Sequence, residues 1–178
     1  MNAAAFTLLF LVALAGTLAV RLWLTARQLR YVGMHRERVP AAFADRIALA
    51  AHQKAADYTR AQQRLARLGM LVDALLLLAL TLGGVLAALI AWTGSWPVGS
   101  VWQDVGLFAV LALIGGVVGL PFAWYSTFVV EERFGFNRMT MRLWFADLAK
   151  GMAIAIVLGL PLLVLILWLM RAAGATWW

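Results

Sequence analysis

Residues 151–170, GMAIAIVLGLPLLVLILWLM, carry no charged side chain, and this stretch decides the class of fold. An α-helix of 20 residues rises about 1.5 Å per residue and is therefore roughly 30 Å long, the thickness of the hydrocarbon core of a bilayer. A helix that is hydrophobic on every side has to be buried in a large core or in lipid. The stretch therefore predicts a helix that crosses a membrane.

Three further stretches are similarly long and apolar, and we predict membrane spans at about residues 3–24, 70–93, 103–124 and 151–170. The composition agrees, because 65% of the residues are hydrophobic and 13% are charged, against roughly 45–50% and about 25% in soluble domains. The predicted fold is all-α. It is a polytopic membrane helical bundle of about four transmembrane helices in a single membrane domain, residues 1–178.

The distribution of Lys and Arg predicts the orientation. Ten of them lie between Arg21 and Arg67 and four between Glu131 and Lys150, whereas residues 94–104 contain none. The positive-inside rule then places the N-terminus outside and residues 25–69 and 126–150 in the cytoplasm. Because basic residues beside hydrophobic spans suit anionic lipid, the net charge of +7 predicts the lipid bilayer as partner and no nucleic acid.

A long amphipathic helix is predicted in the first cytoplasmic segment, over about residues 40–68. Pro40 suits a first helical position, and the residues that follow are rich in Ala, Gln, Arg and Lys, which favour helix. Two interpretations of this helix stay open: a surface that packs on headgroups or on its own bundle, and a face that binds a substrate or partner. Positions on one face recur every three or four residues: Phe43, Ile47, Ala51, Ala55, Tyr58, Gln62 and Leu65.

No complete active site can be assembled from the residue types present. The chain has no cysteine and two histidines, and His35 and His52 lack the i, i+4 spacing that places two zinc ligands on one helix face. The serines Ser95, Ser100 and Ser126 do not lie in a G-x-S-x-G turn. We therefore predict no catalytic and no metal-binding residue in this chain.

The most informative segment is YSTFVVEERFGFNRMT, residues 125–140, which follows the third predicted span. The adjacent carboxylates Glu131 and Glu132 are followed by Gly135 between two phenylalanines, which suits a turn, and Thr140 suits a helix N-cap. By its chemistry alone, the segment is a well-formed cytoplasmic turn. In that interpretation one of the two glutamates pairs with a nearby arginine, namely Arg133, Arg138 or Arg142.

The same segment, above all FVVEERFGFN at residues 128–137, resembles the loop of the type I CAAX prenyl proteases, which are membrane-integral zinc metallopeptidases. Two other regions are similar to bacterial members of that family in the same order. They are residues 35–43 with 52–58, and residues 147–151 leading into 158–161. The resemblance extends from about residue 20 to about residue 170.

This resemblance implies that the chain is the N-terminal membrane portion of such a metalloendopeptidase and forms part of a membrane chamber wall. The family's His-Glu-x-x-His helix follows this portion, so the chain is expected to end before it and to be inactive alone. Glu131, Gly135, Phe136 and Asn137 are matched as family-motif residues, expected to shape the cytoplasmic side near the chamber.

Zinc, a C-terminal protease portion and a peptide substrate are expected only for the full-length family protein, and no cofactor is expected in this chain. The expected location is a bacterial inner membrane. The alternative is a non-enzymatic membrane protein that binds or assembles partners through the amphipathic helix and the loop at residues 131–137.

Overall fold

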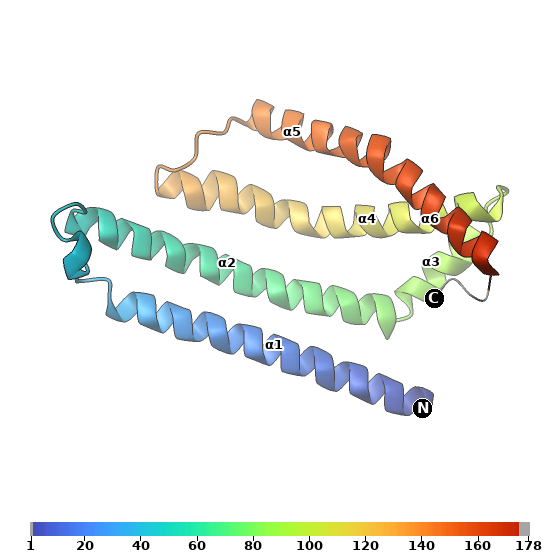
Figure 1. Ribbon diagram of the computed structural model, residues 1–178, viewed down its shortest axis with the longest axis horizontal. Helices are drawn as coiled ribbons and strands as arrows, with labels where there is room; N and C mark the ends of the chain where they lie inside the picture. The colour runs from blue at the N-terminus through green and yellow to red at the C-terminus, as the bar shows by residue number, and fades with distance from the viewer. Residues whose placement is uncertain (1, 175–178) are drawn as a thin grey trace. The chain divides into compact units, whose positions relative to one another are not determined.

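The computed structural model describes residues 2–174, and the regular structure within that range is helical (Figure 1). This confirms the predicted all-α membrane bundle. The helices are α1 (Ala3–Met34), α2 (Leu49–Thr81), α3 (Val85–Gly94), α4 (Ser100–Tyr125), α5 (Met141–Ile154) and α6 (Leu160–Ala173). A 3₁₀ turn lies at Ala41–Phe43, and π-helical segments lie at Ser126–Glu131 and Ala155–Gly159.

The chain folds into two compact units. Unit 1 comprises Met1–Ala79 and Pro121–Asn137, and unit 2 comprises Leu80–Leu120 and Arg138–Trp178. Each unit therefore combines segments that are distant in the sequence. The single membrane domain over residues 1–178 stays a prediction.

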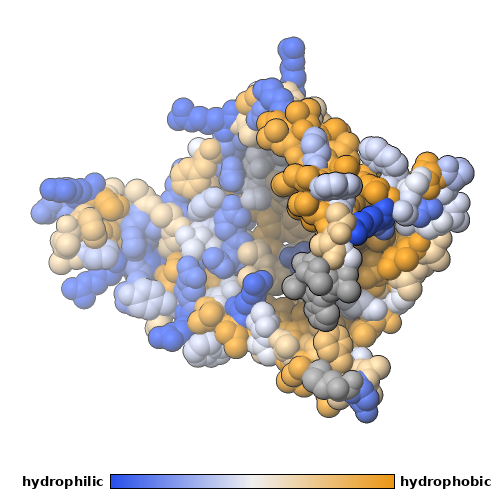
Figure 2. Space-filling view, turned by 45° about the vertical axis from the view of Figure 1, so that its right-hand side comes forward, coloured by the Kyte–Doolittle hydropathy of each residue, from blue (hydrophilic) through white to orange (hydrophobic). Residues whose placement is uncertain are grey.

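Three helical stretches among the described residues are long and apolar enough to cross a membrane: Ala3–Met34, Ser100–Glu131 and Met141–Ala173. A fourth span results if α2 and α3 cross as one bent pair. Large apolar side chains are exposed along these helices, and much of the surface visible in Figure 2 is hydrophobic. Such an exterior is stable in lipid, which agrees with the prediction of about four transmembrane helices.

The helix predicted over residues 40–68 is wrong at its start, because α2 begins at Leu49. The residues before it form the 3₁₀ turn, in which the Phe43 amide donates to the Pro40 carbonyl at 2.9 Å. Helix propensity is overridden here because the chain has to reverse direction between α1 and α2, which lie side by side (Figure 1). At its other end α2 continues without a break into the predicted second span and ends at Thr81.

Two of the spans contain a glycine or a proline that affects the helix. The second span breaks between Thr81 and Val85, where the axis bends by 55° and Gly84 has φ +74°. Pro121 does not end the third span, because the helix runs through it and continues as a π-helix to Glu131. Membrane helices tolerate proline where local helical adjustments satisfy the freed backbone groups.

In unit 2, the start of α4 is fixed against the turn that follows α3. Gln103 Nε2 donates hydrogen bonds to the carbonyl oxygens of Gly94 at 3.0 Å and Trp96 at 3.1 Å. The Trp96 ring lies edge-on to Trp92, with centroids 5.1 Å apart. A Cβ added to Gly106 would overlap the Trp96 ring, so this close approach requires glycine.

Gly106→Ala is therefore expected to destabilise unit 2 by about 1–3 kcal/mol, because the Trp96 ring has to move. Gly116→Ala is the matched control in the same helix, since an added Cβ there meets no atom within 4 Å, and it should be neutral or stabilising. Thermal unfolding of the purified protein in detergent measures both effects. Equal melting temperatures for the two variants would contradict the packing described.

Candidate functional site

The turn after the π-helical segment is built around one carbonyl oxygen. The Glu131 oxygen accepts hydrogen bonds from the amides of Phe136 at 2.9 Å, Asn137 at 3.3 Å and Phe134 at 3.2 Å. Gly135 has φ +66°, a backbone conformation that costs other residues about 1–2 kcal/mol. Residues 131–137, here called the 131–137 turn, are thus held by backbone bonds that require glycine at one position.

The 131–137 turn contacts α2 through aromatic rings. Tyr58 lies edge-to-face against Phe134, with centroids 5.6 Å apart, and against Phe136, with centroids 5.0 Å apart. Lys54 Nζ lies 5.0 Å from the centroid of the Phe136 ring, a geometry in which the ring face attracts the cation. One turn of α2 therefore determines the position of both phenylalanines.

A polar contact supports the aromatic one a turn further along α2. Gln62 Nε2 donates to the Tyr58 hydroxyl at 3.0 Å and to Ser126 Oγ at 3.1 Å, and Ser126 Oγ lies 3.3 Å from Gln62 Oε1. Gln62 thus connects the tyrosine to the first residue of the π-helical segment. π-helical turns occur often at functional sites, and this one faces α2.

The connection between α1 and α2 is fixed by an ion pair. Arg36 donates from Nε to Asp57 Oδ1 at 2.9 Å and from Nη2 to Asp57 Oδ2 at 2.8 Å. These hydrogen bonds lower the pKa of the Asp57 carboxyl, and the charges of Arg60 and Arg133 act in the same direction. The same hydrogen bonds raise the pKa of the Arg36 guanidinium group. The two-pronged geometry is the strong form of an arginine–carboxylate pair.

Further polar contacts join the same connection to the first turns of α2. Gln53 Nε2 donates to Glu37 Oε2 at 2.8 Å, and Glu37 also accepts from Arg36. His52 Nε2 lies 2.9 Å from the His35 carbonyl oxygen. The side chain of His52 therefore contacts the backbone of His35.

The four predicted motif residues lie together in the turn, although nothing tests their functional role. Glu131 contributes its backbone carbonyl and Gly135 its left-handed conformation. The Phe136 ring contacts the Tyr58 ring. Asn137 Nδ2 donates a hydrogen bond to Glu132 Oε2 at 3.0 Å. Within residues 2–174, neither glutamate forms an ion pair with the three arginines considered above.

Sequence reasoning missed the partners of the turn. Tyr58 and Gln62 were placed on one face of the amphipathic helix, together with Leu65, and all three prove to face the segment 121–134. This part of the face therefore packs within unit 1, whereas its other predicted members are exposed: Phe43, Ile47, Ala51 and Ala55. The Thr140 cap was predicted correctly, because its side chain accepts a hydrogen bond from the Leu143 amide at 3.2 Å.

The described residues do not fit a zinc site. Within residues 2–174, no three His, Cys, Asp or Glu side chains come together as metal ligands. His52, the histidine on α2, is directed at a backbone carbonyl. No chemical step can be assigned to a metal held by these residues.

Long apolar helices that expose large apolar side chains define an all-helical integral membrane protein. A family model described as CAAX prenyl protease N-terminal, five membrane helices, matches residues 28–178. The chain belongs to this family and corresponds to the N-terminal membrane domain of CAAX prenyl proteases, as the resemblance predicted.

Individual relatives agree with the family. CAAX prenyl protease 1 of Saccharomyces cerevisiae is 40% identical over 70 residues, which are 39% of this chain and 16% of that protein. The Caenorhabditis elegans homolog is 29% identical over 169 residues, 93% of this chain and 37% of that protein. The crystal structure of S. mikatae Ste24p shares the fold, with a TM-score of 0.83 at 24% identity, over 92% of this chain and 39% of that chain. The chain thus spans less than two fifths of each of these proteins.

Tyr58→Ala is expected to release the 131–137 turn from α2, because it removes two aromatic pairs worth together about 1–3 kcal/mol. Limited trypsin digestion should then cleave faster after Arg133 or Arg138. Tyr58→Phe keeps the aromatic contacts with Phe134 and Phe136 and loses only the hydrogen bond from Gln62. Its cleavage rate should therefore stay near that of the unaltered protein. Equal rates for Tyr58→Ala and Tyr58→Phe would show that the rings do not hold the turn.

Asp57→Asn is expected to lower the melting temperature at pH 7. Because folding lowers the pKa of Asp57 below 3.8, its stabilisation is present above that value and disappears as the pH falls through the folded-state pKa. The difference from the unaltered protein should therefore shrink as the pH is lowered below about 4. Asp45→Asn, an exposed position between α1 and α2, controls for the change of charge, and a pH-independent effect of Asp57→Asn would exclude this linkage.

Proposed function

We propose that the chain serves as the N-terminal membrane part of a zinc-dependent metalloendopeptidase of the CAAX prenyl protease type. The zinc motif would come from a polypeptide region outside residues 1–178, since the described residues do not form a zinc site. The observation that carries this proposal is the 131–137 turn: the segment that resembles the protease loop is held on α2 by the two aromatic contacts of Tyr58. The family match over residues 28–178 supports it.

In this proposal, unit 1 provides part of the wall of a membrane chamber, and the 131–137 turn shapes its charged end. Glu131, Gly135, Phe136 and Asn137 are positioning residues, because each acts through the backbone or through a neighbouring side chain. The peptide substrate and the C-terminal protease portion would be the partners of the chamber wall and of the 131–137 turn. When bound, zinc would supply the activation of water for peptide hydrolysis.

The proposed orientation places the N-terminus outside and residues 25–69 and 126–150 in the cytoplasm of a bacterial inner membrane. The excess of Lys and Arg in these two segments supports this orientation. The Arg36–Asp57 pair and the 131–137 turn would then lie on the cytoplasmic side, where a peptide substrate arrives in water.

The experiment uses a longer polypeptide in which residues 1–178 are followed by the His-Glu-x-x-His region. It is expected to cleave peptides, to bind zinc and to lose activity with a chelator. Gly135→Val should lower kcat/KM about 5- to 30-fold, since the left-handed conformation costs about 1–2 kcal/mol, while the zinc content stays unchanged. Gly135→Asn is the matched control, because Asn tolerates this conformation better.

A longer protein that binds no zinc and is unaffected by chelators would contradict the proposal. The DNA that follows the coding sequence provides a second test. An open frame encoding His-Glu-x-x-His supports a protease, and a stop without such a sequence favours the non-enzymatic membrane binding or assembly protein.

A further inference from the structure

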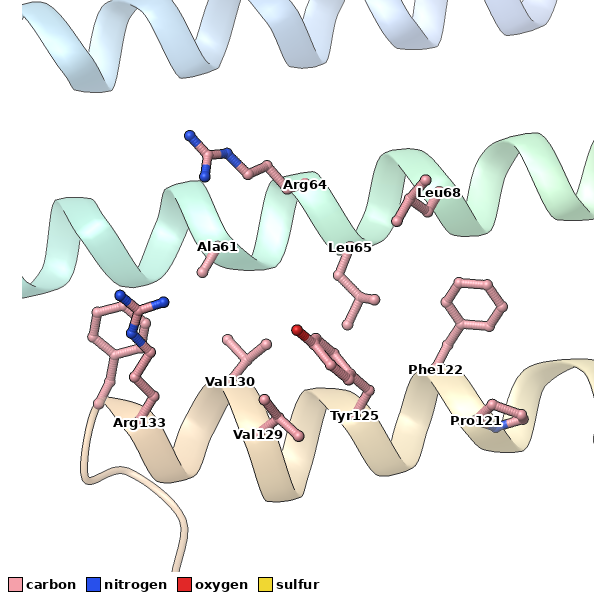
Figure 3. A pocket seen from close by; sticks show the side chains of 11 residues that line it. Ala61, Arg64, Leu65, Leu68, Pro121, Phe122, Tyr125, Val129, Val130 and Arg133 are labelled. Atoms are coloured by element: carbon pink, nitrogen blue, oxygen red, sulfur yellow. The ribbon is translucent and has the colours of Figure 1, made fainter.

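A groove of about 440 Å³ runs within unit 1 between α2 and the segment 121–134. Figure 3 shows Leu65, Tyr125 and Val130 pointing into the space between these two helical segments. Leu68 is 57% and Tyr125 is 45% exposed, so the groove is open to its surroundings. Most of its lining is apolar, and it lies against a helix long enough to span the membrane.

One end of this groove is strongly basic. Arg64 and Arg133 line it, and both also line an adjoining cavity of about 310 Å³ together with Arg60 and Asp57. Asp57 is already bound by Arg36 through two hydrogen bonds. Among the described residues, Arg60, Arg64 and Arg133 take part in no ion pair. The end of the groove therefore carries three arginines that form no ion pair within residues 2–174, beside one carboxylate, Asp57, which is hydrogen-bonded to Arg36.

These two features select one class of ligand in a membrane. A small soluble anion would satisfy the arginines but would leave the apolar length of the groove exposed. A lipid without net charge would fill the apolar part but would leave the guanidinium groups without an anion. Basic pockets between membrane helices bind acidic lipid headgroups, and guanidinium groups bind phosphate oxygens through paired hydrogen bonds.

We propose that this groove binds an anionic phospholipid. The phosphate lies at Arg64 and Arg133, and an acyl chain lies along Leu65, Leu68 and Phe122. Arg60 adds positive charge at the same end. The proposal requires only that the protein lies in a bilayer and is independent of any proteolytic activity.

Native mass spectrometry of the full 178-residue chain in detergent tests this site with phosphatidylglycerol and phosphatidylcholine. The unaltered protein is expected to bind phosphatidylglycerol at least about tenfold more tightly. The double variant Arg64→Gln/Arg133→Gln should weaken phosphatidylglycerol binding about 25-fold, at about fivefold for each arginine near a lipid surface. Its binding of phosphatidylcholine should change little.

The matched control is Arg46→Gln/Arg142→Gln, which removes the same number of charges from positions that line neither cavity. This variant should keep the preference for phosphatidylglycerol. Circular dichroism at the same protein concentration checks that both double variants retain the helical content. A groove variant that keeps the preference, or a control variant that loses it, would overturn the proposal.

A second measurement places the acyl chain. Because the chain contains no cysteine, Leu68→Cys introduces a single thiol for a fluorophore in the apolar part of the groove. Phosphatidylglycerol brominated on its acyl chain should quench this fluorophore at concentrations where brominated phosphatidylcholine does not. Glycerol phosphate, which has the headgroup phosphate without the chains, should compete at least about tenfold less well than the lipid. If glycerol phosphate competed as well as the lipid, the groove would be a simple anion site. If both brominated lipids quenched the fluorophore equally, the groove would be a general lipid contact. Either result overturns the proposal.

Discussion

The edge-to-face contacts of Tyr58 with Phe134 and Phe136 connect two parts of unit 1 that are far apart in the sequence. Few side chains among the described residues are buried, and the apolar ones in this unit are Ala56 and Val130. So small a core leaves the register of α2 against segment 121–137 to specific aromatic and polar contacts. The conformation of the turn, the groove and the placement of Arg133 all depend on this register.

The bilayer explains why the structure can have so small a core. In water, the exposed leucine, valine and phenylalanine side chains of α1, α4 and α6 would drive aggregation. In lipid, the exposure of these apolar side chains carries no cost in free energy, and the helices associate through packing and polar contacts. Specific polar contacts therefore support both units. In unit 1 they are the ion pair of Arg36 with Asp57 and the hydrogen bond of Gln62 with Ser126, and in unit 2 they include the ion pair of Arg171 with Asp104.

The sequence predicts an integral membrane protein well, because the length of an uncharged apolar stretch depends only on consecutive residues. The uncharged stretch 151–170 lies within the helical stretch Met141–Ala173, and the glycine turn and the Thr140 cap follow from single residues. The start of α2 could not be predicted in this way. The residues after Pro40 favour helix individually, but a turn forms there because the chain reverses direction, and Arg36 and Asp57 pair across this reversal.

The partners of the turn were also beyond sequence reasoning, because a contact between residues distant in the chain leaves no periodic pattern. Tyr58 and Gln62 were identified only as members of one helix face. The sequence could not show that this face meets the π-helical segment, or that Lys54 lies over the Phe136 ring. The sequence also suggested that Glu131 or Glu132 pairs with a nearby arginine. In the structure, the Asn137 side chain instead donates a hydrogen bond to Glu132.

A double-mutant cycle between Tyr58 and Phe136 measures the central contact most directly. The free energies of unfolding of Tyr58→Ala, Phe136→Ala, the double variant and the unaltered protein are compared in one detergent. An aromatic pair in this geometry predicts a coupling of about 0.5–1.5 kcal/mol between the two positions. Additive effects, with a coupling of zero within error, would contradict the claim that Tyr58 holds the turn on α2.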